Sequence, residues 1–127
     1  MTTVRTGKPP HGVRLQIIDT AGGLVGCLTG GEAPHVGGVV LAVPRASLKG
    51  EGVGCDCWVS PVPGHKDAEV AASVAKMLCV ALNVPVSITA GIHMDAATPG
   101  DIAAIVGNCE RAGEKMLRRL KQASLTG

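Results

Sequence analysis

Residues 55–90 read CDCWVSPVPGHKDAEVAASVAKMLCVALNVPVSITA, and the fold can be worked out from this stretch outward. Apolar residues at helical spacing mark an amphipathic helix over about 66–82: Val70, Val74, Met77, Leu78, Ala81 and Leu82. We predict a strand before it, at 55–60, and another after it, at 85–90. A strand, a helix and a strand form a βαβ unit, so the two strands run parallel if they lie in one sheet.

The N-terminal half of the chain predicts three more strands. Apolar and polar residues alternate over 13–18, as in a half-buried strand, and a turn at 20–23 joins this strand to a second at 24–29. Residues 36–43 are almost all apolar, which is typical of a central strand covered on both faces. We expect Pro44 to end that strand. These segments read as a hairpin followed by a third strand.

A second helix is predicted from the sequence Thr98-Pro99-Gly100-Asp101 onward. Thr98 suits the N-cap, proline suits the first helical position, and an acid follows three residues after the cap. The element order is therefore ββββαβα. The expected fold class is α/β (α+β): one domain over 11–127, with a mixed, mostly antiparallel sheet and two helices, after a flexible leader at 1–10.

Composition excludes several classes of protein. The 127 residues are 46% hydrophobic and 17% charged, which argues against disorder. The net charge of +2 and the near absence of aromatic residues argue against nucleic-acid binding. No apolar run approaches the roughly 18 residues of a membrane span, and no signal-peptide pattern is present. We therefore expect a cytoplasmic protein that acts away from membranes.

The five cysteines and the small size lead to two further expectations. The cysteines form no CxxC pair, so they read as small buried apolar residues in a reducing compartment. A domain this small gains stability from pairing, and twofold oligomers are the commonest. We expect a homodimer that uses the second faces of the strands, including Ile18 and Trp58.

The predicted topology gathers three histidine-containing loops. The loops at 63–67 and 91–95 both follow strands that run parallel, so they lie at one sheet edge. The loop at 34–38 joins them if its strand pairs antiparallel with the strand at 55–60. His35, His65 and His93 would then converge beside two helix N-termini, which favour a phosphate or carboxylate ligand.

Each residue of this predicted site also has a plainer explanation. Gly37 and Gly38 either let strands pack closely or let a flat ligand reach the backbone. Asp95 is either functional or an Asx-turn residue, and Asp67 reads as a helix-start charge. Imidazole and carboxylate groups also suit zinc or iron, although the spacing is not diagnostic. The chain has no recognisable nucleophile elbow, phosphate loop or HExxH string.

Three strings of the sequence resemble the prenylated-flavin chaperone family, the small accessory proteins that accompany gallate and protocatechuate decarboxylases. They are residues 31–48, beginning GEAPHVGGVVLA, residues 63–67 (PGHKD), and residues 90–99, beginning AGIHMD. The resemblance runs in order over about residues 11–120. The family is similar in fold to proteasome-assembly chaperones, which agrees with the element order and implies a homodimer.

The resemblance implies a non-catalytic protein that holds reduced prenylated FMN (or FMN). It would help deliver this cofactor to a UbiD-type aromatic-acid decarboxylase. A flavin prenyltransferase is a further partner that the resemblance suggests. The cofactor-binding positions it implies are His35, Gly37, Gly38, Arg45, Gly64, His65, Lys66, His93 and Asp95. Asp95-Ala96-Ala97 departs from the Asp-Asn or Asp-Asp pair expected there, and no aromatic side chain is available to stack on a flavin.

The sequence also leaves two alternative functions open. One is a metal- or flavin-dependent enzyme that uses His35, His65 and His93. The other is an assembly chaperone that binds protein surfaces and no cofactor.

Overall fold

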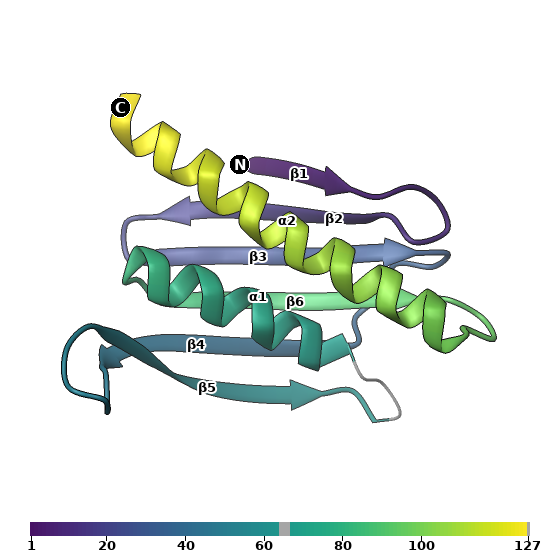
Figure 1. The fold of residues 1–127 in the computed structure, drawn as a ribbon, viewed down its shortest axis with the longest axis horizontal. Helices are drawn as coiled ribbons and strands as arrows, with labels where there is room; N and C mark the ends of the chain where they lie inside the picture. Colours follow the sequence, from purple (N-terminus) through teal and green to yellow (C-terminus); the bar gives the residue numbers. More distant parts are fainter. Residues whose placement is uncertain (64–66, 127) are drawn as a thin grey trace.

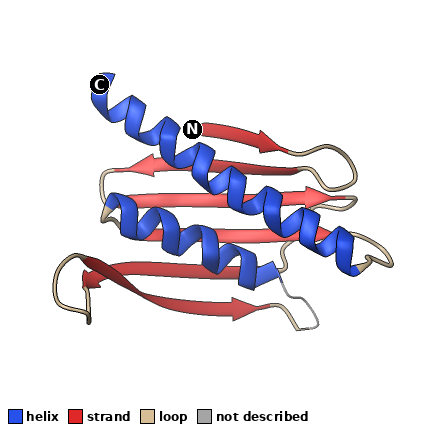
Figure 2. Cartoon of the chain, viewed as in Figure 1, coloured by secondary structure: helices blue, strands red, loops and turns tan. Residues whose placement is uncertain are grey.

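A computed structural model describes residues 1–63 and 67–126 of the chain. Within these residues, two helices lie against one face of a six-stranded sheet whose strand order is β1-β2-β3-β6-β4-β5 (Figure 1). Figure 2 shows both helices crossing the same face of the sheet. The elements are β1 (Thr2–Thr6), β2 (Val13–Thr20), β3 (Gly23–Gly31), β4 (Gly38–Ala46), β5 (Val53–Pro61), α1 (Asp67–Leu82), β6 (Val86–His93) and α2 (Pro99–Thr126). The predicted fold class is confirmed, with one strand more than expected.

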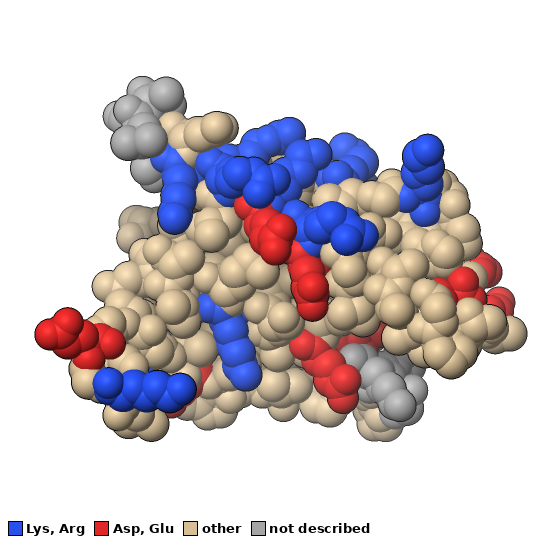
Figure 3. Space-filling view, viewed as in Figure 1, with Lys and Arg blue, Asp and Glu red and all other residues tan. Residues whose placement is uncertain are grey.

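The additional strand, β1, lies in the segment predicted as a flexible leader, and that prediction is wrong. β1 pairs antiparallel with β2, from Thr2 opposite Ile17 to Thr6 opposite Val13. Val4 points inward and is 1% exposed. Lys115 and Arg119 of α2 donate to the backbone carbonyls of Arg5 and Thr3 in β1. Figure 3 shows Lys and Arg side chains gathered over this part of the molecule.

The strand after α1, β6, lies in the middle of the sheet rather than beside β5. It pairs parallel with β3 and antiparallel with β4, whereas β4 pairs antiparallel with β5. β5 and β6 therefore run in the same direction, as the βαβ unit predicts, but β4 lies between them. The ends of β5 and β6 and the beginning of β4 consequently share one edge of the sheet.

Two predictions about β4 are wrong. Pro44 does not end the strand, which continues to Ala46. Beyond Ala42 the strand pairs only with β5, and a proline is tolerated where a strand lacks a neighbour on one side. β4 is also not covered on both faces, because Val39 and Leu41 point away from the helices and are exposed.

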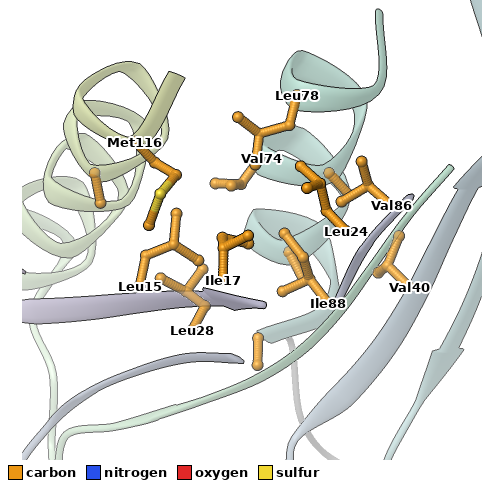
Figure 4. Close-up of a cluster of buried hydrophobic side chains, with 14 of the residues drawn as sticks. Leu15, Ile17, Leu24, Leu28, Val40, Val74, Leu78, Val86, Ile88 and Met116 are labelled. Atoms are coloured by element: carbon orange, nitrogen blue, oxygen red, sulfur yellow. The ribbon is translucent and has the colours of Figure 1, made fainter. Parts of the chain in front are cut away.

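The core lies between the sheet and the two helices. Figure 4 shows Leu15, Ile17, Leu28 and Ile88 rising from the strands to meet Val74 and Leu78 of α1 and Met116 of α2. These side chains are fully buried or nearly so, and almost all of the core is aliphatic. No helix in the described part of the chain is long and apolar enough to cross a membrane.

The beginning of α2 is held by a capping box and a histidine. The Thr98 hydroxyl accepts from the Asp101 backbone N–H at 3.1 Å, and the Asp101 carboxylate accepts from the Thr98 N–H at 2.9 Å. His11, between β1 and β2, lies 2.8 Å from the same carboxylate. These hydrogen bonds lower the pKa of Asp101 to about 2, with the Thr98 backbone N–H as the largest cause.

The position of β1 predicts the effect of shortening its buried side chain. Val4→Ala should lower the free energy of unfolding by about 2 kcal/mol, since it removes two buried carbons and leaves a small cavity. Arg5→Ala, at the exposed neighbouring position, should change it by no more than about 0.5 kcal/mol. Urea unfolding of both variants measures the difference. Equal values would mean that β1 is not part of the folded sheet.

The lowered pKa of Asp101 predicts a loss of stability in acid. Its folded pKa lies below the ordinary value of 3.8, so its stabilising effect is complete above that value and is lost as the pH falls toward 2. The melting temperature of the wild type should fall over this range, and Asp101→Asn should lose part of that pH dependence. Asp19→Asn, an exposed position on β2, serves as the control and should follow the wild type.

Candidate functional site

The candidate site lies at the sheet edge where β3, β5 and β6 end, β4 begins, and α1 and α2 have their N-termini. His35, in the loop before β4, and His93, at the end of β6, meet there. Their ring centroids are 6.0 Å apart and their planes are at 80°. The predicted convergence is confirmed for this pair. Gly64, His65 and Lys66 lie outside the described residues.

Asp67, the first residue of α1, holds His35 in place. Its Oδ2 atom lies 2.9 Å from His35 Nε2 and also accepts the Ile92 backbone N–H at 3.3 Å. The distance between His35 Nε2 and Asp67 Oδ2 is that of an ion pair, but the two groups are not aligned for a hydrogen bond. On the other side of the ring, Nδ1 lies 3.0 Å from the Ala33 carbonyl. Each ring nitrogen therefore faces an oxygen, and the imidazole has one defined orientation.

Three glycines make this arrangement possible. A Cβ on Gly37 would overlap the Asp67 carboxylate, and one on Gly91 would overlap the His35 backbone carbonyl. A Cβ on Gly38 would lie 2.7 Å from that of Ala68. Gly37 and Gly38 are buried, and the N–H and carbonyl of Gly37 bond to Ala90 and Val62. For this pair the structure supports close packing rather than direct access by a flat ligand.

His93 is the more open of the two histidines. Its Nε2 atom lies 2.7 Å from Oδ1 of Asp95, and both side chains are exposed. Its backbone carbonyl accepts the Glu32 N–H at 2.7 Å, which holds the end of β6 against the loop after β3. Asp95 thus positions an imidazole that remains accessible to a ligand.

Arg45, which the resemblance implies as a cofactor contact, lies elsewhere. It is near the other end of β4, where its Nε atom donates to Asp56 at 2.8 Å and a terminal nitrogen donates to the Ala46 carbonyl at 3.1 Å. Most of the length of β4 separates it from Gly38, so within one chain it does not reach the histidines.

An apolar groove opens beside the histidines, between the N-terminal halves of α1 and α2. Its volume is about 260 Å³. Aliphatic side chains form most of its wall, and Asp67, Glu69 and His93 complete it. Its apolar lining residues are Val70, Ile92, Met94, Ala97, Ile102, Ile105 and Val106. A larger hollow of about 630 Å³ is lined by α1 alone, so we regard it as open surface rather than a binding site.

Two parts of this site were not predicted from the sequence. Asp67 reads there as a helix-start charge only, yet it contacts both His35 and β6. The groove could not be recognised in the sequence, because its apolar residues fit the same helical pattern as the core residues. The structure distinguishes Ile102 from them by its 54% exposure. Among the described residues, no group of three or more His, Cys, Asp or Glu side chains is arranged to hold a metal ion.

The five cysteines are all free thiols. Burial raises the pKa of Cys57 and Cys79, and it raises the pKa of Cys109 to about 12. Protonated thiols are poor nucleophiles and poor metal ligands. These three cysteines therefore behave as small apolar residues, as the sequence predicts.

Comparison with solved structures supports the fold. A structure titled "Crystal Structure of a Novel Chaperone Complex for Yeast 20S Proteasome Assembly" matches with a TM-score of 0.58 at 14% sequence identity, covering 95% of each chain. At this identity the likeness concerns the fold alone. No curated protein sequence matched the chain.

Comparison with family models identifies the family. The model of the prenylated flavin chaperone LpdD-like domain matches residues 7–121. This range includes β2 to β6, α1, most of α2, and both His35 and His93. The sequence motifs, the fold and this match agree, and the chain belongs to the prenylated flavin chaperone LpdD-like family.

Proposed function

We propose that this protein is a non-catalytic chaperone that binds reduced prenylated FMN and helps deliver it to a UbiD-type aromatic-acid decarboxylase. The observation that carries the proposal is the meeting of His35 and His93 beside an apolar groove, in a chain of the prenylated flavin chaperone family. When bound in the decarboxylase, the prenylated flavin supplies the reactive ring system. In this protein the same ring system would be held and shielded.

The residues at the sheet edge fit the chemistry of a flavin mononucleotide. The ligand has an anionic phosphate and a large flat ring system, so it needs donors at one end and apolar surface at the other. His93 and the N-terminus of α1 offer donors, and the groove offers apolar surface. His65 and Lys66, outside the described residues, are the sequence's candidates for the phosphate. Gly37, Gly38 and Gly91 would act indirectly, by letting His35 and α1 pack together.

An anaerobic titration tests the binding proposal. Reduced prenylated FMN should bind the wild type, and His93→Ala or His65→Ala should weaken binding roughly 10- to 100-fold, since a charge-assisted contact contributes about 1.5–3 kcal/mol. His93→Ala should leave the melting temperature nearly unchanged, because the side chain is exposed.

Lys49→Ala, at the far end of the sheet, is the control for this titration and should bind like the wild type. Equal affinities for all variants would mean that the histidines are bystanders. Decarboxylation of an aromatic acid by the purified protein alone would instead favour an enzyme.

We also propose that the protein is a homodimer that pairs through the open face of its sheet. Ile18, Val25, Leu41 and Trp58 form a row across this face, in register through Ser87. Ile18 is 51% exposed and Trp58 58% exposed. An apolar row of this extent on the bare face of a sheet is typical of an interface. A twofold pairing of two such faces would cover both rows.

A charge placed in the middle of the row should prevent pairing. Leu41→Asp should convert a dimer into a monomer in sedimentation experiments at micromolar concentration, because burying an unpaired carboxylate is strongly unfavourable. Leu48→Asp is the matched control, since Leu48 is exposed in the loop between β4 and β5. A wild type that sediments as a monomer would contradict the proposed dimer.

The proposed partner sets the expected compartment. A UbiD-type decarboxylase and a flavin prenyltransferase would meet this protein in the cytoplasm, and five free cysteines fit a reducing compartment.

A further inference from the structure

The groove between α1 and α2 begins at the histidine edge and narrows where the two helices come into contact. At the edge it is bounded by Met94 and Ala97 in the loop before α2 and by the exposed side chain of Ile102. Farther along, a second hollow of about 170 Å³ lies between the helices and shares Glu69, Val70 and Val106 with the groove. Deeper still the helices touch, since a Cβ on Gly113 would lie 3.1 Å from the Met77 sulfur.

The described lining residues of the groove disfavour a phosphate inside it. Its ionisable lining groups are Asp67, Glu69 and His93, and the groove has no Lys or Arg among its described lining residues. Two carboxylates would repel an anion, while the aliphatic walls favour uncharged carbon. The described lining therefore favours an occupant that places an uncharged, apolar part between the helices and keeps its anionic part outside.

The geometry points to a selectivity pocket: the groove between α1 and α2 receives the prenyl-derived carbons of the flavin and makes the protein prefer prenylated FMN over FMN. This inference rests on the proposed function, because it assumes that a flavin binds at the histidine edge. Prenylated FMN differs from FMN by an added apolar unit on its ring system. Both share the phosphate, so contacts to the phosphate cannot distinguish them. An adjoining aliphatic groove can.

The preference should be large enough to measure. Burial of apolar carbon contributes free energy in proportion to the area covered, and several carbons in a partly open groove correspond to roughly a 10-fold or greater difference in affinity. The ratio of the dissociation constants for reduced FMN and reduced prenylated FMN reports this difference directly. Contributions from the rest of the flavin cancel in the ratio.

Anaerobic titration of both reduced flavins into three variants tests the pocket. Ala97→Leu fills the groove and should bring the ratio close to one by weakening prenylated FMN, with the affinity for FMN changed less than about twofold. Ile102→Ala removes an exposed wall residue and should lower the ratio by a smaller factor of about 3. Ala103→Leu adds the same bulk at an exposed position of α2 outside the groove and should keep the wild-type ratio. Thermal melts of each variant check the fold.

The outcomes separate this inference from the proposed function. A wild type that binds both flavins equally, or an unchanged ratio in folded Ala97→Leu and Ile102→Ala, would overturn the selectivity pocket and leave flavin binding intact. A wild type that binds neither flavin would overturn both. A ratio that falls in Ala97→Leu and Ile102→Ala but not in Ala103→Leu is the result we expect.

Discussion

The Asp67 carboxylate is the contact on which the histidine edge depends. It begins α1, faces Nε2 of His35 at 2.9 Å and accepts the backbone N–H of Ile92. One side chain thereby links the first helix, the loop before β4 and the end of β6. With a side-chain exposure of 14%, it lies where the partial positive charge of a helix N-terminus favours a carboxylate. The glycines at 37 and 91 give it and the His35 loop the space they need.

The asymmetry of the sheet gives the molecule two different faces. The helices cover one face and leave the groove and the histidines at its edge, whereas the other face carries a row of exposed apolar residues. These two regions are independent, because pairing through the bare face would not cover the groove. A dimer would therefore present two open histidine edges. Under the proposed function, this division would let the protein hold a ligand while staying accessible to another protein.

Several features followed from local patterns in the sequence. The alternation over 13–18 and the turn after it predicted the β2–β3 hairpin, because strand periodicity and turn residues act over a few positions. Thr98 and Asp101 predicted the capping box that the structure contains. The βαβ unit, together with an antiparallel pairing of the strands at 36–43 and 55–60, predicted that His35 and His93 meet. That prediction succeeded because the direction of strands, rather than their neighbours, determines which loops share an edge.

By itself, then, the sequence determined the types of most elements, the direction of β5 and β6 and the family motifs. Only the tertiary structure decided that β6 lies between β3 and β4, that β1 pairs with β2, and that Asp67 reaches His35. Strand neighbours are chosen by hydrogen bonds between segments far apart in the chain, which leave no mark on local periodicity. The groove has the same origin: Val70 and Ile102 look like core residues in the sequence, and only the spacing of two packed helices leaves them facing an open space.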